Sequence, residues 1–354
     1  FTINAMAIDL GVLTLDDSTE TKEAEVYDPY GGINDIQLKK IKAVGTPIER
    51  FTEDGLRAFK ACRLAAQLRF DIEEETFKAI SESIPVAAQV SMERVRDEFM
   101  KMLLNSAKPS IGIELMRKTG LLKLFMPELL EGIGVEQKLF HSDDVYWHNL
   151  RTCDVAHDSV KLAALLHDLA KPRTDMGNGH FYGHDIMGAE MAEVILKRMK
   201  FPQAEIKRTV LLIKNHMFYY PHIEEGMSEE EKNNIELHQW SDSAVRRFIQ
   251  RVGRENIDDL FKLRLADAQA NPSTAFKPEE ITLLQKRISE VLQQDMALKV
   301  TDLRITGEDL VNMGIPKGPR IGKILQELLD MVLEDPMLNT KEKLMENAKR
   351  LAHI

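Results

Sequence analysis

The chain has 354 residues, of which 44% are hydrophobic, so it is long enough to bury a sizeable core in two or three domains. Its formal net charge of -10 excludes a protein that coats nucleic acid with a generally basic surface, although a local basic stripe can still bind RNA. No apolar run approaches a membrane span, no signal-peptide pattern is visible, and the two cysteines, Cys62 and Cys153, indicate no disulfide framework. We therefore expect a cytoplasmic protein.

The first 44 residues have the pattern of a small sheet. Residues Thr2 to Ile8 and Glu25 to Tyr27 alternate like strands, and the polar stretch between them suits a hairpin tip. A turn beginning at Asp28 then leads to a short helix predicted around Ile36 to Ile41. Asp28 and Asp35 can bind a metal, but we expect them to act in the turn and as a cap.

A helix predicted from Glu53 to Phe70 carries a carboxylate and a guanidinium close together. Asp54 and Arg57 are three residues apart, and this spacing puts them on one helical face. Such a pair can hydrogen-bond the edge of a nucleotide base, but it is also common on ordinary surface helices, so the spacing alone leaves both interpretations open. Two further cations, Lys60 and Arg63, lie on nearby turns.

Amphipathic helices continue as far as a polar break at residues 132–136, which predicts a domain boundary. The strongest of them opens at Ser91 to Arg94 and runs on through Phe99 and Leu103. We expect Glu93 and Arg94 to brace this part of the chain rather than to touch a substrate.

Beyond the break, histidines and aspartates recur in a pattern that suits a metal centre. The set comprises His148, the adjacent His167 and Asp168, His184, His216 and Asp267. Imidazole and carboxylate ligands suit a divalent transition metal, and a site with open positions can activate water for phosphoester hydrolysis. His184 and His216 would extend the site to two metals, and the other four form its core. The remaining histidines are expected to be structural: His141, His157, His180, His222, His238 and His353.

Cations in the second half of the chain are placed where they can meet phosphate. Lys171 and Arg173 follow the His167–Asp168 pair, and they can contact a phosphate or simply stabilise a helix C-terminus. A turn after Gly314 leads into a helix whose N-terminal region carries basic residues, an arrangement that suits a phosphate but that two packed helices also need as a connection. The basic residues there are Lys317, Arg320 and Lys323.

Helix signals organise the rest of the C-terminal region. Pro278 marks the start of a long helix, and Thr306 with Asp309 forms a capping signature for another. We therefore expect this region to be entirely helical.

Several of these segments occur in the order that is found in one enzyme family. Phe1 to Asp9, Asp28 to Ile36, Val44–Gly45, Arg50 to Asp54 with Arg57, and Ser91 to Arg94 resemble the motifs of the bacterial class of tRNA nucleotidyltransferases. These are the CCA-adding enzymes and their poly(A) polymerase relatives. The later set of histidines and aspartates resembles the HD phosphohydrolase superfamily, a domain that many members of the first family carry after their neck helices.

The resemblance implies that Asp54 and Arg57 read the Watson–Crick edge of incoming CTP or ATP, so that protein acts as the template. Cytosine and adenine both present an amino donor beside a ring-nitrogen acceptor, which a carboxylate next to a guanidinium can satisfy. The resemblance also assigns Asn4, Lys60 and Arg63 to nucleotide binding. The family usually has arginine at the position of Lys60, where a lysine keeps the charge without the bidentate geometry.

Nucleotidyl transfer in this family requires Mg²⁺ ions held by a carboxylate pair in a catalytic head that precedes the segment matching Phe1. The sequence begins inside a motif, so we expect most of the head to be missing and the chain alone to be inactive in transfer. Three explanations stay open: a fragment, a structure from which a disordered head was omitted, or a natural split enzyme with a separate head polypeptide.

These patterns and the resemblance predict a mainly α fold in four parts. The parts are a remnant of an α/β head sheet (1–45), a helical neck with the nucleotide-selecting motif (46–134), an HD-type metal-binding helical domain (135–272) and a helical RNA-binding C-terminal region (273–354). Three functions are consistent with them. The first is a tRNA nucleotidyltransferase that adds C, A or both, the second a phosphohydrolase acting on RNA ends or nucleotides through Mn²⁺, Ni²⁺, Fe²⁺ or Zn²⁺, and the third a non-catalytic tRNA-binding subunit.

Overall fold

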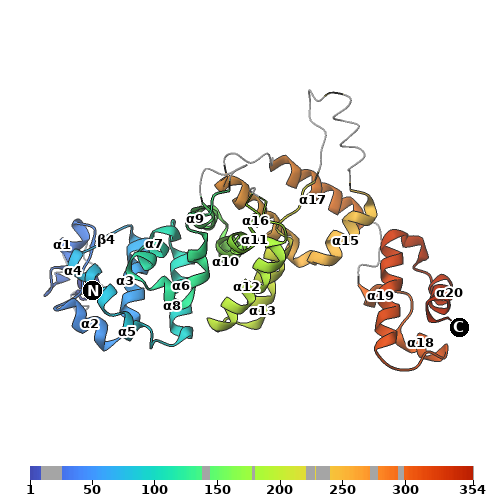
Figure 1. Cartoon of the computed structure of the whole chain (residues 1–354), viewed down its shortest axis with the longest axis horizontal. Helices are drawn as coiled ribbons and strands as arrows, with labels where there is room; N and C mark the ends of the chain where they lie inside the picture. Colours follow the sequence, from blue (N-terminus) through green and yellow to red (C-terminus); the bar gives the residue numbers. More distant parts are fainter. Residues whose placement is uncertain are drawn as a thin grey trace, which may run out of the picture. The chain divides into compact units, whose positions relative to one another are not determined.

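The computed structural model describes residues 1–8, 26–137, 144–177, 180–220, 228, 240–271, 278–293 and 299–353. The described chain is mainly helical (Figure 1), which confirms the predicted fold class. Its described residues also form two two-stranded sheets. It divides into a first unit of residues 1–216 and 262–274 and a second unit of residues 217–261 and 275–354. None of the described helices combines the length and apolar character that a membrane span requires. The division into four parts stays a prediction.

The first unit begins with short elements and continues as packed helices. Up to residue 132 these are η1 (Thr2–Asn4), β1 (Ala7–Ile8), β2 (Val26–Tyr27), α1 (Gly32–Gln37), β3 (Lys40–Ile41), α2 (Pro47–Glu53), α3 (Leu56–Leu68), β4 (Asp71–Ile72), α4 (Glu74–Glu82), α5 (Ile84–Ala87), α6 (Met92–Asn105), α7 (Pro109–Thr119), α8 (Leu122–Phe125) and η3 (Pro127–Gly132). Strands β1 and β2 are antiparallel, and β3 and β4 are parallel.

The predicted strand from Thr2 to Ile8 is wrong over its first half. The segment forms the 3-10 turn η1, and only Ala7–Ile8 pairs as a strand. The buried Thr2 side chain explains the turn, because its hydroxyl donates to Asp35 Oδ2 at 2.7 Å while its amide donates to the Lys42 carbonyl at 3.0 Å. Asp35 is therefore part of the anchor for the N-terminal segment.

The helix predicted around residues 36–41 is also wrong, since α1 occupies Gly32–Gln37 and a strand follows at Lys40–Ile41. The Asp28 carboxylate accepts hydrogen bonds from the amides of Gly32 and Ile33 at 2.7 and 2.8 Å, so the helix starts at that turn. Asp28 therefore has the turn role expected from the sequence.

The helix predicted from Glu53 to Phe70 is broken at its start. Helix α2 ends at Glu53, Asp54 is extended (φ -154°, ψ 106°), and α3 begins at Leu56. Asp54 and Arg57 therefore do not share one continuous helical face. Gly55 follows the break, and its backbone lies so close to α5 that an added Cβ would come within 2.8 Å of the Ala87 Cα and amide nitrogen.

Replacing Gly55 with alanine is expected to lower the free energy of unfolding by about 1–3 kcal/mol, because the methyl group overpacks the backbone of α5. Urea unfolding followed by circular dichroism measures the change. The control is Gly322→Ala on α19 (Pro319–Glu334), where an added Cβ meets nothing within 4 Å. That exposed helical position should be stabilised by about 0.5–1 kcal/mol. Equal effects at the two glycines would refute the close-packing explanation.

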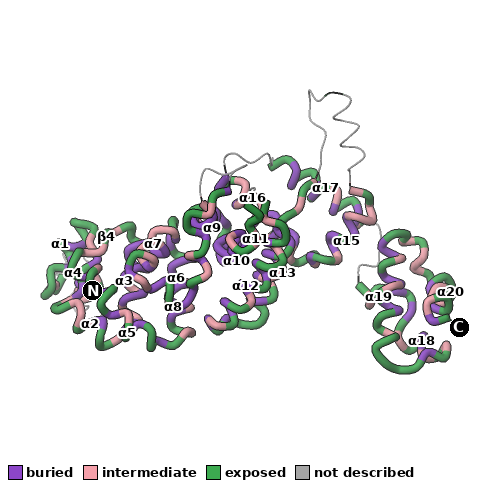
Figure 2. Tube along the Cα trace, in the orientation of Figure 1, coloured by how far each residue is buried: buried purple, intermediate pink, exposed green. Residues whose placement is uncertain are grey.

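Helix α3 packs against α6 and α7, and together with α8 they form the main core of this region (Figure 2). Phe59 of α3, Phe99 of α6 and Phe125 of α8 are fully buried. The Phe125 ring lies 6.0 Å from the Phe59 ring and 5.3 Å from the Phe99 ring, both edge to face. These apolar contacts hold α3, which carries Arg57 and directly follows Asp54 and Gly55, in place.

The first unit continues with helices that surround the predicted metal ligands. They are α9 (Val145–Val155), η4 (Asp158–Val160), α10 (Lys161–Leu166), α11 (Lys171–Thr174), α12 (His184–Arg198), α13 (Gln203–Asn215) and all but the first turn of α16 (Ile257–Ala270). Helices α12 and α13 pack along each other, and α10 contacts both α9 and α13. The segment Lys161–Leu166 is buried throughout, so the residues that follow it enter the interior.

The second unit is helical in all its described elements, as predicted. They are α15 (Asp242–Val252), η5 (Arg254–Asn256), α17 (Pro278–Gln293), η6 (Val300–Asp302), α18 (Gly307–Asn312), α19, η7 (Pro336–Leu338) and α20 (Lys341–Ala352). Pro278 begins α17, and Thr306 with Asp309 forms the predicted capping box of α18, with both reciprocal bonds present. The sequence signals were sufficient here because caps are local hydrogen bonds.

The Asp309 carboxyl is expected to titrate near pH 2. A hydrogen bond from Lys341 at 2.9 Å, followed by bonds from Thr306, lowers its pKa from 3.8 to about 2. Because the folded pKa is depressed, the interaction stabilises the fold above pH 3.8 and is lost as the pH falls through about 2. A carbon-13 NMR titration of the carboxyl measures this pKa. In Lys341→Met the midpoint should rise, and an unchanged midpoint would show that Lys341 does not cause the shift.

Candidate metal centre and nucleotide pocket

The structure brings all six predicted metal ligands together inside the first unit. They are His148 on α9, His167 and Asp168 directly after α10, His184 at the start of α12, His216 directly after α13, and Asp267 on α16. Five of the six are buried, and the Asp267 side chain is 13% exposed. Residues separated by more than a hundred positions in the sequence thus form one cluster.

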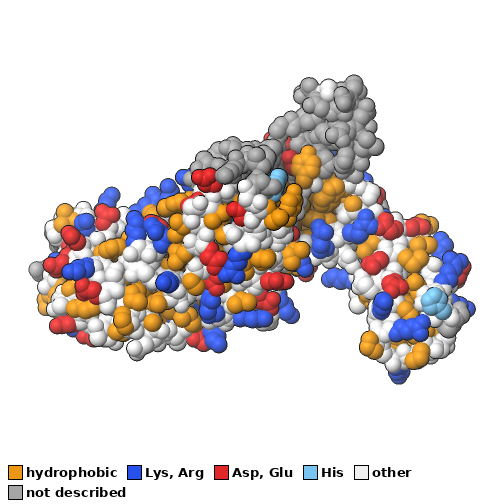
Figure 3. All heavy atoms as spheres, viewed as in Figure 1, with side chains coloured by type: hydrophobic (Ala, Val, Ile, Leu, Met, Phe, Trp, Pro, Cys, Tyr) orange, Lys and Arg blue, Asp and Glu red, His pale blue; other side chains and the backbone are white. Residues whose placement is uncertain are grey.

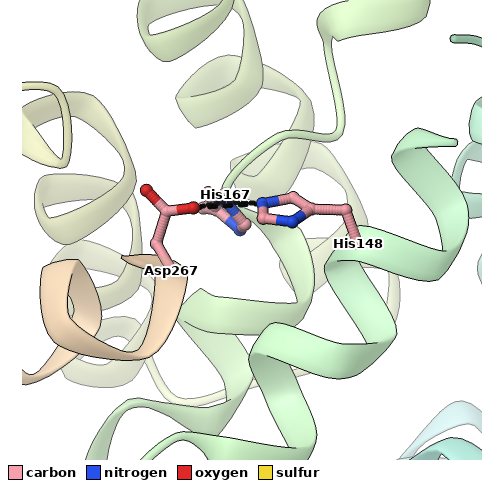
Figure 4. Close-up of side chains that lie close together, drawn as sticks. All are labelled: His148, His167 and Asp267. Atoms are coloured by element: carbon pink, nitrogen blue, oxygen red, sulfur yellow. Dashed lines mark hydrogen bonds and ion pairs between the residues drawn. The ribbon is translucent and has the colours of Figure 1, made fainter. Parts of the chain in front are cut away.

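The inner ring nitrogens face two carboxylates. His148 Nε2 lies 3.2 Å from His167 Nε2 and 3.1 Å from Asp267 Oδ1, and Figure 4 shows these three side chains converging from separate segments. Asp168 Oδ2 lies 3.3 Å from His167 Nε2, whereas Asp168 Oδ1 lies 3.4 Å from His184 Nε2 and 3.6 Å from His216 Nε2. Asp168 therefore presents one oxygen to each half of the cluster.

Three of the histidines are oriented by their own backbone. The Nδ1 atoms of His167, His184 and His216 lie 2.8, 2.6 and 2.7 Å from carbonyl oxygens three residues earlier in the chain. If each Nδ1 carries the proton and donates it to that carbonyl, each Nε2 keeps a lone pair directed at the cluster. This is the outer hydrogen bonding that metal-binding histidines normally have.

The donor set fits a divalent transition metal. His148, His167 and Asp267 form one group, and His167, Asp168 and His216 form another, with the ligand atoms of each group lying within 4.8 Å of one another. Asp168 Oδ1, His184 Nε2 and His216 Nε2 are buried and have no hydrogen-bond partner among the described residues. Buried lone pairs that face one another are costly unless a cation satisfies them.

Charge within the cluster favours a cation. Burial lowers the pKa of His167, but the Asp168 and Asp267 carboxylates outweigh it and raise the pKa to about 10. Burial raises the pKa values of the two carboxyls, yet the neighbouring histidines outweigh it and hold both well below their usual range. Burial also lowers the pKa of His184. The carboxylates stay ionised, and a proton on His167 stands where a metal ion would supply positive charge.

The other predicted histidines have local roles where they are described. His157 Nδ1 accepts a hydrogen bond from the Ser159 amide, His180 stacks on Tyr182, and His353 ends α20 in a left-handed conformation. His141, His222 and His238 lie outside the described residues. Arg173 forms a bidentate pair with Glu131 at 2.7 and 2.8 Å and so points away from the ligands.

A second candidate site is a pocket of about 340 Å³ near the N-terminus. Its walls include three of the residues implied in nucleotide binding, Asn4, Arg57 and Lys60, and sequence reasoning missed the others. The complete lining is Phe1, Asn4, Ala5, Ala43, Val44, Arg50, Phe51, Arg57 and Lys60. Three cations and two aromatic side chains give this pocket the charge for a polyphosphate and the apolar surface for a base.

Asp54 and Arg57 are held by separate ion pairs beside this pocket. Arg57 Nη1 donates to Glu53 Oε2 at 2.6 Å, and Glu53 also pairs with Arg50 at 2.6 Å. Asp54 accepts from Arg94 Nη2 at 2.9 Å and from the Leu56 amide at 3.1 Å. Burial raises the pKa of Asp54, but the Arg94 contact outweighs it and leaves the pKa lowered. Arg94 therefore contacts the side chain implied in base reading.

The remaining predicted cations differ in how accessible they are. Arg63 donates to Glu98 Oε2 at 2.7 Å, its side chain is only 13% exposed, and it is not among the pocket-lining residues. Lys317, Arg320 and Lys323 are all exposed, and Arg320 also donates a hydrogen bond to the Ala352 carbonyl at 2.8 Å. In the view of Figure 3, acidic and basic side chains are interspersed rather than gathered into one basic stripe.

Comparison with known proteins gives matches along most of the chain. Three family models match: "Probable RNA and SrmB- binding site of polymerase A" over residues 69–132, "HD domain" over residues 133–270 and "tRNA nucleotidyltransferase domain 2" over residues 261–348.

Individual relatives agree with these models. The A-adding tRNA nucleotidyltransferase of Deinococcus radiodurans is 32% identical, covering 93% of this chain and 73% of its own length. The CC-adding tRNA nucleotidyltransferase of Thermus thermophilus is 29% identical, covering 83% of this chain and 66% of its own length. Among solved structures, the Bacillus stearothermophilus CCA-adding enzyme in complex with CTP has the same fold, with a TM-score of 0.62 at 21% identity. That match covers 100% of this chain and 74% of the other.

Proposed function

Because the chain belongs to the bacterial family of tRNA nucleotidyltransferases and CCA-adding enzymes, we propose that it carries the nucleotide-selecting and RNA-binding body of an enzyme that extends the 3′ end of tRNA with C, A or both from CTP and ATP. The observation that carries this proposal is the pocket lined by Asn4, Arg57 and Lys60, beside the anchored Asp54.

In this proposal each side chain has a separate task. Asp54 accepts from the exocyclic amino group of cytosine or adenine, and Arg57 donates to the adjacent ring nitrogen. Uracil and guanine present the opposite polarity at these positions and would leave buried groups unpaired. Lys60 and Arg50 attract the triphosphate, while Glu53 and Arg94 hold the two base-reading side chains in place.

Joining the nucleotide to RNA requires the Mg²⁺-binding carboxylates of a catalytic head, in the same polypeptide or in a separate one. The experiment incubates tRNA that lacks its 3′ end with labelled CTP and ATP, using this chain with and without the head. We expect incorporation only with the head. Failure to incorporate either nucleotide in its presence, with Asp54 and Arg57 intact, would refute the proposal and favour a non-catalytic tRNA-binding subunit.

We further propose that the exposed lysines at the start of α19 contribute to tRNA binding. Lys317 and Lys323 are exposed near the helix N-terminus, whereas Arg320 already bonds the end of α20. Charge reversal at both lysines should weaken tRNA binding and reduce its salt dependence, as measured by fluorescence anisotropy across a salt series. An unchanged salt slope would remove these lysines from the interface.

A second activity is favoured by the metal-ligand cluster. We propose that the HD domain binds a divalent transition metal, Mn²⁺, Ni²⁺, Fe²⁺ or Zn²⁺, and hydrolyses phosphomonoesters or phosphodiesters of RNA ends or nucleotides. The cluster that supports this consists of four histidines and two aspartates. When bound, the metal would activate water and polarise the phosphoryl group. Assays with each metal on 2′- or 3′-phosphorylated and cyclic-phosphate RNA ends test the activity, and no hydrolysis with any of them would refute it.

A further inference from the structure

Each carboxylate of the metal-ligand cluster has its own cation one helical turn away. Asp168 Oδ2 lies 2.5 Å from the ammonium of Lys171, three residues later in the chain. Asp267 Oδ2 lies 2.7 Å from Arg264 Nη1, three residues earlier. Both cations are largely buried, with side-chain exposures of 11% for Lys171 and 15% for Arg264. The same pairing of a carboxylate with a cation three residues away therefore occurs on two segments that are far apart in the sequence.

The Asp267 pair leaves the other oxygen of that carboxylate to the histidines, whereas Asp168 Oδ2 faces both Lys171 and His167 Nε2, the latter at 3.3 Å. Asp267 Oδ1 faces His148 Nε2 at 3.1 Å, and Asp168 Oδ1 faces His184 Nε2 at 3.4 Å. The carboxylates thus keep donors for a metal while a cation at hydrogen-bonding distance offsets the negative charge of each. Since burial reduces screening by water and salt, this balance acts at nearly full strength.

The net charge of the side chains around a bound metal determines how strongly the metal attracts an anion. Lys171 and Arg264 offset the negative charge of the two carboxylates, and histidines that bind a metal through Nε2 are neutral. A divalent ion held there would keep more of its positive charge than one held by two carboxylates without neighbouring cations. We propose that Lys171 and Arg264 are specificity-determining residues that weaken metal binding in order to leave a positive centre for a phosphate dianion. The proposal rests on the HD domain being a metal-dependent phosphohydrolase.

A buried amide beside Lys171 also indicates an anion-binding site. Gln137 is 3% exposed, and its Oε1 accepts a hydrogen bond from Lys171 Nζ at 2.5 Å. Its Nε2 has no hydrogen-bond partner among the described residues. A buried amide donor without a partner is costly. An anion oxygen next to the lysine would satisfy both donors, so Gln137 and Lys171 together form the anion-facing side of the site.

Charge balance and a purely structural role for the two cations predict opposite changes in metal affinity when a cation is removed. If Lys171 and Arg264 only positioned their aspartates, removing either would weaken both metal binding and phosphate binding. If they balance charge, removing either should tighten metal binding and weaken phosphate binding. The variants Lys171→Met and Arg264→Met remove the charge with side chains of comparable bulk, and they test the two carboxylates separately, so a folding defect in one leaves the other informative.

Two measurements on the whole chain separate the outcomes. Isothermal titration with Mn²⁺ gives the metal dissociation constant, and broadening of the phosphorus-31 signal of inorganic phosphate by bound Mn²⁺ reports how closely the anion approaches the metal. We expect about tenfold tighter Mn²⁺ binding and about tenfold weaker phosphate binding in each methionine variant. Lys171→Arg keeps the charge and should resemble the wild type. So should Arg173→Met, which removes a neighbouring charge that pairs with Glu131.

Weaker Mn²⁺ binding in both methionine variants would overturn the proposal and leave a positioning role. Unchanged phosphate broadening in both variants would also overturn it. If the wild-type chain binds no Mn²⁺, Ni²⁺, Fe²⁺ or Zn²⁺ at all, the metal centre itself is refuted. If it binds a metal but charge removal does not tighten that binding, only the present inference fails.

Discussion

Replacing Asp168 with asparagine is expected to weaken divalent-metal binding by at least about 100-fold and to abolish any phosphoester hydrolysis, while leaving nucleotide addition intact. Asp168 is the residue whose two oxygens face both halves of the cluster. Changes in the outer shell of a metal site already cost about 10- to 100-fold in affinity, and this change removes an anionic ligand itself. Isothermal titration with Mn²⁺ and an RNA-phosphatase assay measure the two losses.

Asp97→Asn is the matched control for this variant. Asp97 lies on α6, is 56% exposed and pairs with the neighbouring Arg96, so its loss should leave metal affinity unchanged. Circular dichroism verifies that Asp168→Asn is folded, because the substitution leaves Lys171 without an anionic partner. A folded Asp168→Asn protein with wild-type metal affinity would show that the cluster is not the metal site. Loss of nucleotide addition would show that the two activities are coupled.

Replacing Arg57 with alanine is expected to lower kcat/KM for CTP and ATP by about 10- to 100-fold when the catalytic head is present. A hydrogen bond from a charged group contributes about 1.5–3 kcal/mol, and the remaining base-reading acceptor, Asp54, would be left with an incomplete site. Selection against UTP and GTP should decline as well, because the discriminating donor is gone. Steady-state assays with each of the four nucleotides and truncated tRNA measure both effects.

The fold should tolerate this substitution, because Glu53 keeps its ion pair with Arg50 at 2.6 Å. Lys78→Gln is the control, since Lys78 lies on α4 with 78% of its side chain exposed and is absent from the pocket lining. Equal losses in the two variants would indicate a general charge effect rather than base reading. An unchanged preference for CTP and ATP in Arg57→Ala would move nucleotide selection to other residues.

The metal-ligand cluster shows how far sequence reasoning reaches. The ordered set of histidines and aspartates, together with its resemblance to the HD superfamily, selected the six residues that the structure gathers. The partners of these ligands were not predicted. Arg264 carried a usable signal, because it lies three residues before Asp267 in a helical pattern. Gln137 carried none, because it meets Lys171 across 34 residues of chain.

The base-reading segment shows where the same reasoning failed. Helical period assigned Asp54 and Arg57 to one continuous face, and the structure breaks that face at the extended residue Asp54. Gly55, next to this break, packs against the backbone of α5, more than 30 residues away, which leaves no room for a side chain at that position. A similar cause moved the first predicted strand into a turn, because Thr2 is anchored by Asp35.

The mainly α fold and the caps of the later helices could be predicted from the sequence, because helical period and capping are local properties, and the family resemblance supplied the residues of both candidate sites. Contacts between distant segments became visible only in the folded chain: Arg94 with Asp54, Arg57 with the N-terminal pocket, and Gln137 with Lys171. Helix packing sets the geometry of these contacts, because they join segments that are distant in the sequence. Packing in turn depends on the shape of the whole core rather than on any one stretch of chain.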